Sequence, residues 1–341
     1  MSFFDQNKMN PSLFFIIFFH NLMTRKTCAV LIDLLWFIIG ISMVMNFFYT
    51  VLTVMMSFFS SDSLTIQNSV AVDSSGMQTV VAESVKTSVP TKKKLVYPKI
   101  KNNAFSVGEK LTFKVRYGVV RAGTATMSVL KETKVQDHPV YQIQTTAVSD
   151  APFSWVFSVN DVVNSFIDRE GLFSWRFEKK LREGNYEMDL LVDYSPQDSL
   201  ARVKYIRYKD DVERLNYDVK APPFVLDILA SFYYIRTRDL NVGDVISITN
   251  HDNKKIYDLE VQVYMRETIS TAAGKFRCLR VEPLLKGEGI FKQKGRLLVW
   301  VTDDEFKIPV QMTSEVVVGH ITTELEKIEG IPGPIPARIS K

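Results

Sequence analysis

Apolar and polar residues alternate along most of the chain after residue 104. In the segment 109–117, every second residue from Leu111 to Tyr117 is apolar, and the residues between them are polar or charged. A period of two is typical of a β-strand with one buried face. The pattern recurs in 124–131, 139–149, 172–181, 186–194, 200–208, 257–264, 276–282, 296–302 and 308–325. It predicts a mainly β domain, in which about 10–12 antiparallel strands form one curled sheet or open barrel over a single core.

One segment of this domain has helical spacing instead. Its apolar residues recur three or four positions apart from Phe224 to Tyr233, directly after Pro222 and Pro223. Proline is common in the first turn of a helix, and an apolar stripe of this kind packs against a core. We therefore expect one packing helix that opens at the two prolines. A helix that lines an apolar cavity is the alternative.

A different pattern lies near the N-terminus, where residues 34–59 contain no charged side chain. Such a run is long enough to cross a bilayer as a helix. No small-residue cleavage site follows it, which favours an uncleaved transmembrane signal anchor over a cleaved signal peptide. Arg25 and Lys26 precede the run and Asp62 follows it, so the N-terminus is expected to be cytoplasmic.

These patterns divide the chain into five parts. They are a cytoplasmic segment at 1–27, the transmembrane anchor at 28–59, a flexible linker at 60–104, the β-rich domain at 105–328 and an irregular tail at 329–341. The apolar stretch 13–19 is too short to span a membrane. It fits either an interfacial segment or a translation start at Met23.

Charge and cysteine content narrow the function classes. Outside the first 59 residues there are 39 Lys and Arg against 36 Asp and Glu, which gives no electrostatic reason to expect nucleic acid as a partner. Cys28 opens the anchor and Cys278 lies in a predicted strand, so a disulfide between them is not expected. The partner that the sequence does predict is the membrane, through residues 34–59.

Several short segments of the β-rich domain occur in a characteristic order and spacing. They are GEKLTF (108–113), VRAGTA (120–125), VND (159–161), SFID (165–168), SFYYIR (231–236), VGD (242–244), VWVTDD (299–304) and IPV (308–310). Together they resemble a bacterial envelope family, domain of unknown function 3108, over about residues 104–328. The resemblance implies an exported β-rich domain and supplies no agreed activity. With the anchor, it implies a single-pass protein of the bacterial inner membrane whose domain is periplasmic.

The sequence contains no motif for a known chemistry. The domain has three histidines, His138, His251 and His320, and no two of them are at the spacing of metal ligands. G-x-S-x-G, C-x-x-C and H-E-x-x-H are absent from the sequence. We therefore expect no metal, no cofactor and no catalytic residues, and a protein that is not an enzyme.

Carboxylates supply the polar candidates. Asp303 and Asp304 end a predicted strand. They either act together on a proton or cation or form a turn, and the sequence favours the turn. Asp161 and Asp168 are an odd number of residues apart, so a regular strand places them on opposite faces. One of them is then inward and is a candidate partner for Arg236 at the end of the predicted helix. Structural pairing is favoured over catalysis.

Aromatic residues supply the candidates for ligand binding. Phe173, Trp175 and Phe177 share one face of a predicted strand by alternation, and Phe232 and Tyr233 belong to the helix. Core packing is the default interpretation of such residues. The alternative is that they line a cavity for a lipid or another apolar ligand.

These observations favour a non-enzymatic envelope protein that binds an apolar ligand, such as a lipid or lipid-linked glycan, or that acts as a scaffold in envelope assembly. One alternative is a hydrolase of an envelope polymer, which requires Asp161, Asp168, Asp303 or a histidine to meet in one cleft. The other is a structural module that docks a partner protein and holds no ligand.

Overall fold

The computed structural model describes residues 95–208, 211–252, 254–285, 296–315 and 319–340, which belong to one compact unit. The expected anchor, the cytoplasmic segment and most of the linker lie outside these residues. Within the described ranges, no helix combines the length and apolar character that a membrane crossing requires.

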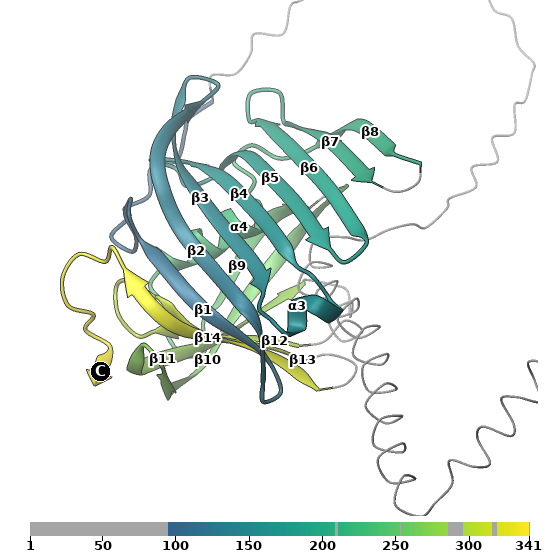
Figure 1. The fold of residues 1–341 in the computed structure, drawn as a ribbon. Helices are drawn as coiled ribbons and strands as arrows, with labels where there is room; N and C mark the ends of the chain where they lie inside the picture. The colour runs from purple at the N-terminus through teal and green to yellow at the C-terminus, as the bar shows by residue number, and fades with distance from the viewer. Residues whose placement is uncertain (1–94, 209–210, 253, 286–295, 316–318, 341) are drawn as a thin grey trace, which may run out of the picture. The chain divides into compact units, whose positions relative to one another are not determined.

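The described residues form a single open, antiparallel sheet of 15 strands (Figure 1). The strands are β1 (Lys110–Tyr117), β2 (Val120–Val135), β3 (His138–Ser149), β4 (Asn160–Asp168), β5 (Ser174–Glu183), β6 (Tyr186–Ser195), β7 (Leu200–Tyr208), β8 (Glu213–Lys220), β9 (Val245–Asp252), β10 (Lys255–Thr271), β11 (Gly274–Leu285), β12 (Leu297–Thr302), β13 (Pro309–Glu315), β14 (His320–Glu329) and β15 (Arg338–Ser340). Successive strands pair from β1 to β8 and from β9 to β14, and β1 pairs with β14 to join the two runs. Strands β8 and β9 form the two edges of the sheet, and β15 pairs with β11.

The mainly β prediction is confirmed, but the expected 10–12 strands are too few. The stretch 308–325, predicted as one strand, is divided between β13 and β14. The predicted alternating segments did not include β4, β8 or β9. In β8, Leu215, Tyr217 and Val219 do alternate with polar residues, so its sequence carried the signal. Strand β15 was missed because three prolines precede it and because it is only three residues long.

Strand β6 shows how the alternation builds the core. Its residues Met188, Leu190, Val192 and Tyr194 are buried, while the residues between them are half-exposed. Burying a side chain of this size contributes about 1.5–3 kcal/mol. Gly184, at a φ of 55°, forms the turn that returns β5 into β6. The same arrangement in neighbouring strands turns one apolar face of the sheet toward a common core.

Helix α4 (Ile228–Arg236) lies inside the curl of the sheet, between β4 and β9 (Figure 1). Its expected start at Pro222 is wrong. Phe224 has a φ of 63°, which a helix does not allow, and the helix begins only after Asp227, whose carboxylate accepts a hydrogen bond from Ala230 N. A second helix, the four-residue α3 (Phe153–Val156), was not expected.

Both ends of the described chain are more ordered than the sequence predicts. The linker was expected to be flexible up to residue 104, but Ile100 N donates to Glu170 O and Ala104 is buried. The tail was expected to be irregular from 329 onward, but Ala337 is buried and leads directly into β15. Both segments are rich in proline and polar residues, and each nevertheless has an alanine that is buried in the domain.

Candidate functional site

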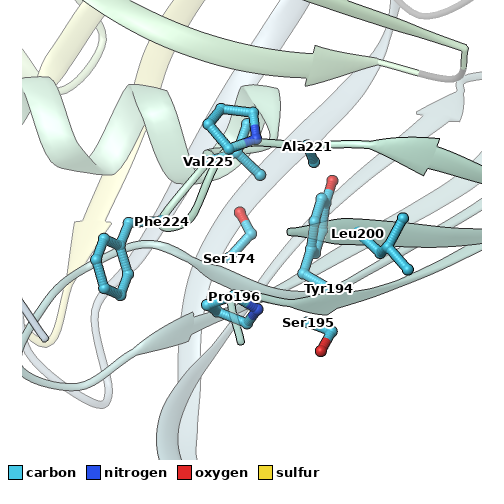
Figure 2. Close-up of a pocket in the computed structure, with 9 residues that line it drawn as sticks. Ser174, Tyr194, Ser195, Pro196, Leu200, Ala221, Phe224 and Val225 are labelled. Carbon is cyan, nitrogen blue, oxygen red and sulfur yellow. The ribbon is translucent and has the colours of Figure 1, made fainter. Parts of the chain in front are cut away.

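A pocket lies where the ends of β5, β6 and β7 meet the segment that connects β8 to α4 (Figure 2). It is a shallow depression and not an enclosed cavity, since the roughly 170 Å³ between its lining atoms includes open solvent. Its lining consists of Ser174, Tyr194, Ser195, Pro196, Leu200, Ala221, Pro222, Phe224 and Val225. The walls are mainly apolar, and the hydroxyl groups of Ser174 and Tyr194 are the polar groups nearest the connecting segment (Figure 2).

The hydroxyl of Ser174 belongs to a buried network around Asp227. Ser174 Oγ and Ser165 Oγ donate to the same oxygen of Asp227, at 2.6 and 2.7 Å. Asp227 N in turn donates to Ser174 Oγ at 2.7 Å. Burial raises the pKa of Asp227, and the two hydroxyl donors oppose this by stabilising its charged form. The network fastens the segment before α4 to β4 and β5.

The hydroxyl of Tyr194 is held by His251 of β9. Tyr194 OH lies 3.0 Å from His251 Nδ1, and the two rings meet edge to face at 5.5 Å. Burial raises the pKa of Tyr194 well above its ordinary value. The contact connects β6 to β9 across the inside of the sheet, so the wall of the pocket is fixed from behind.

Four charged residues gather deeper on the concave face. Lys179 is fully buried, and its Nζ lies 3.9 Å from an oxygen of Asp252. Burial lowers the pKa of Lys179 to about 8, against the attraction of Asp252, Glu183 and Asp161. Asp161 accepts a hydrogen bond from Arg182 N at 2.7 Å.

Asp161 and Glu183 form a carboxyl pair within this group. Burial raises the pKa of each, and the negative charge of Asp161 raises that of Glu183 further. Two buried carboxyls this close cannot both be ionised cheaply, so the pair holds one proton at neutral pH. Among the residues that the structure describes, no three His, Cys, Asp or Glu side chains are placed to hold a metal ion.

The carboxylates singled out by sequence are not brought into one cleft. Asp161 and Asp168 lie at opposite ends of β4. Asp168 accepts hydrogen bonds from Gly171 N and from Trp175 Nε1, at 2.7 and 2.9 Å, so it organises the turn into β5. The two residues lie on opposite faces of β4, as expected, since Asp161 has the parity of the buried Val163 and Ile167 and Asp168 does not. Both are nevertheless buried, because the turn into β5 encloses Asp168.

Asp303 and Asp304 also act separately. Asp303 Oδ2 pairs with Arg266 Nε at 2.8 Å on the surface. Asp304 accepts from the backbone nitrogens of Phe306 and Ala337, at 3.1 Å each, and so forms a turn. The turn interpretation is the one that these hydrogen bonds support.

The expected pairing of Arg236 with an aspartate of β4 is wrong. Arg236 pairs instead with Glu109, which was not predicted. A usable signal was present, because Glu109 has the same parity as the inward Leu111 and Phe113. Lys179 is likewise a charged residue at an inward position of its strand, and its contacts were not predicted.

The five aromatic candidates occupy different places. Phe173 and Trp175 belong to a small cluster with Val135 and Val140, whereas Phe177 lies in the main core. The expected single face is interrupted by a register shift in the pairing of β4 with β5.

The helix aromatics also pack internally. Tyr233 is fully buried and meets Phe105 edge to face at 4.9 Å, and Phe232 packs against the main core. None of the five aromatic candidates lines the pocket, but Phe224 does, and its ring lies 4.9 Å from that of Phe173.

The pattern of short segments noted above corresponds to a known family model. The model for a protein of unknown function (DUF3108) matches residues 112–326. The chain belongs to this family. A search of curated proteins returned no match.

Solved structures of low sequence identity align with this chain. A β-barrel-like protein of the family DUF1849 from Brucella abortus is 12% identical, with a TM-score of 0.42, and the match covers 65% of this chain and 97% of that one. An exported protein with a YmcC-like fold from Bacteroides fragilis is 12% identical, with a TM-score of 0.28 and coverage of 69% and 100%. A protein described as a lipoprotein from Parabacteroides distasonis is 12% identical, with a TM-score of 0.29 and coverage of 68% and 97%.

Proposed function

We propose that this DUF3108 domain is a non-enzymatic binding module of the bacterial envelope, held on the periplasmic side of the inner membrane by residues 34–59. Its pocket takes a small apolar group, which we identify as the end of a lipid acyl chain. The observation that carries this proposal is the lining: six of its nine side chains are apolar, and the other three, Ser174, Tyr194 and Ser195, carry hydroxyls. Apolar walls with few polar groups are typical of ligand sites.

The size of the pocket limits what it holds. Sites for whole drug-sized ligands occupy roughly 300–1,000 Å³, whereas this pocket is a shallow depression without enclosed space, so a chain end enters only when the lining side chains move apart. Each methylene group that enters contributes about 0.8 kcal/mol. The rest of the ligand therefore stays outside, over β7 and the segment before α4.

The polar groups near the pocket argue against a hydrolase. The hydroxyl of Ser174 donates to Asp227, while the nearest histidine, His251, contacts Tyr194. The Asp227 carboxylate that accepts from Ser174 also accepts from Ser165 and caps α4 through Ala230 N, so its oxygens are used by structural hydrogen bonds. These groups instead hold β4, β5, β6, β9 and the segment before α4 together, which is what a rigid binding site requires.

Native mass spectrometry with lipid extraction tests the proposal on the full-length chain, purified from a bacterial membrane in maltoside detergent. We expect lipid at a fixed stoichiometry. Leu200→Trp places an indole in the pocket and should lower the bound fraction about tenfold. Lys204→Trp, on an exposed position of the same strand, is the matched control and should bind as the wild type does. An empty wild-type protein, or equal occupancy in the two variants, would sink the proposal in favour of a module that docks a protein.

A further inference from the structure

Strand β8 leaves one side of the sheet open. Within the described ranges it pairs only with β7, over Leu200–Tyr208, and it ends the strand order (Figure 1). An edge strand presents a row of backbone N–H and C=O groups that another strand can bind. Natural edges are usually kept short or protected by bulges, and β8 has eight residues in unbroken register with its neighbour.

The orientation of the backbone of β8 follows from one hydrogen bond at its end. Ala221 N donates to Ser199 O, so residue 221 directs its backbone groups toward β7. In a regular antiparallel strand, alternate residues direct these groups to opposite sides. Leu215, Tyr217 and Val219 therefore bond to β7, and the even-numbered residues 214 to 220 offer their N–H and C=O groups to the open side.

The side chains on these even-numbered positions carry a self-complementary pattern. Arg214, Asn216 and Asp218 are all exposed. When a second β8 strand runs antiparallel with Asn216 opposite Asn216, each Arg214 lies opposite Asp218 of the other copy. Opposite-charge pairs across strands are favourable, and like charges are not.

Neighbouring registers lose this match. A shift of two residues in one direction places Arg214 opposite Lys220, which is a like-charge pair. A shift in the other direction places Arg214 opposite Asn216 and leaves Asp218 without a basic partner in β8. Charge therefore selects one register among those that the backbone allows.

We propose that β8 is a dimerisation edge, at which a second copy of this chain adds its own β8 with Asn216 opposite Asn216. The two sheets then continue across a two-fold axis, as isologous interfaces require. The three even-numbered pairs form about six hydrogen bonds between the copies. The half-buried side chains Leu215, Tyr217 and Val219 of each copy gain apolar neighbours on the concave side.

The competing interpretation is that the charges on β8 protect the edge against pairing. Cysteine crosslinking of the full-length chain in detergent separates the two. In the proposed register the two Asn216 Cα atoms are about 5.5 Å apart, within the range of about 4.4–6.8 Å that a disulfide spans. Lys204 pairs with Asn216 one strand further in, so two Lys204 residues are about 14 Å apart, or three strand spacings.

The crosslinking variants are made with Cys28→Ser, and Cys278 is left in place because it is buried. Under mild oxidation, Asn216→Cys should form disulfide-linked dimers at least about tenfold faster than the control Lys204→Cys. Equal rates, or no dimer from Asn216→Cys, would overturn the proposal.

A charge exchange provides a second, independent readout. Arg214→Asp and Asp218→Arg each create two like-charge pairs across the axis and should weaken dimerisation about tenfold, as measured by native mass spectrometry over a concentration series. The double variant restores both pairs with reversed sign and should return the dissociation constant to within about twofold of the wild type. Single variants without effect, or a double variant as weak as the singles, would show that the edge does not pair in this register.

Discussion

Arg236 and Glu109 form a two-pronged ion pair that is almost completely excluded from solvent. Arg236 Nη1 lies 2.6 Å from Glu109 Oε1, and Nη2 lies 2.8 Å from Oε2. Two further guanidinium N–H groups donate to the carbonyl oxygens of Phe306 and Ala104, at 3.1 and 3.0 Å. Arg236 ends α4 and Glu109 precedes β1, so the pair connects the internal helix to the strand where the two halves of the sheet join.

Arg236→Met should destabilise the domain by about 3–5 kcal/mol, because it leaves the Glu109 carboxylate buried without a cation. Adding Glu109→Leu should recover much of this loss, since two apolar side chains of similar size replace the pair. Denaturant unfolding of the full chain, followed by tryptophan fluorescence, gives the free energies. The control is Arg266→Met, which removes an exposed pair with Asp303 and should cost less than about 1 kcal/mol. Equal losses in the two single variants would contradict the prediction.

Stability should fall as pH rises through the range in which Glu183 titrates. The fold raises the pKa of Glu183 from 4.5 to about 8, so the folded protein binds this proton more tightly than the unfolded chain does. The contribution of Glu183 is therefore fully present below pH 4.5 and is lost as pH rises toward 8. Glu183→Gln mimics the protonated form and should remove most of this decline between pH 5 and 8.

Thermal unfolding measured across this pH range checks the prediction for Glu183. Glu178→Gln makes the same charge change at a half-exposed position of the same strand. It should leave the pH dependence as it is in the wild type. A Glu183→Gln variant with an unchanged slope would show that the carboxyl pair does not hold the proton.

Two glycines near the C-terminus should respond differently to the same substitution. Gly330 and Gly333 both have positive φ, 71° and 84°. A Cβ atom at Gly330 would overlap the carbonyl oxygen of Gly108, whereas at Gly333 it would meet nothing within 4 Å. Gly330→Ala should therefore cost at least about 2 kcal/mol more than Gly333→Ala. Matching unfolding midpoints for the two variants would refute the close approach.

The parts of the fold that could be predicted from the sequence depend on neighbours along the chain. The alternation in β6 and β10 identified these strands because successive side chains of a strand point to opposite faces of the sheet. The start of α4 could not be found in this way. It is set by Asp227, whose side chain is fixed by Ser165 and Ser174 from strands more than fifty residues away in the sequence.

The candidate site was less predictable than the fold for the same reason. Lys179, Glu183 and His251 acquire their properties from partners on other strands, and the sequence does not give those distances. Phe173 and Trp175 left the expected face because β4 and β5 shift in register, which depends on both strands. A charged residue at an inward position, as at Lys179 and Glu109, was the one local sign of these contacts.

The pairing of β1 with β14 has a consequence for how the protein reaches its native state. All other neighbouring strands in the main order are also consecutive in the sequence, so each such pair can form as soon as the turn between the two strands forms. One edge of β1 instead stays unpaired until β14, near the end of the domain, is available. Closing so long a loop is slow, and a waiting strand edge is prone to aggregate. Productive folding therefore passes through a half-built sheet in which the free edge of β1 is exposed to aggregation until β14 is in place.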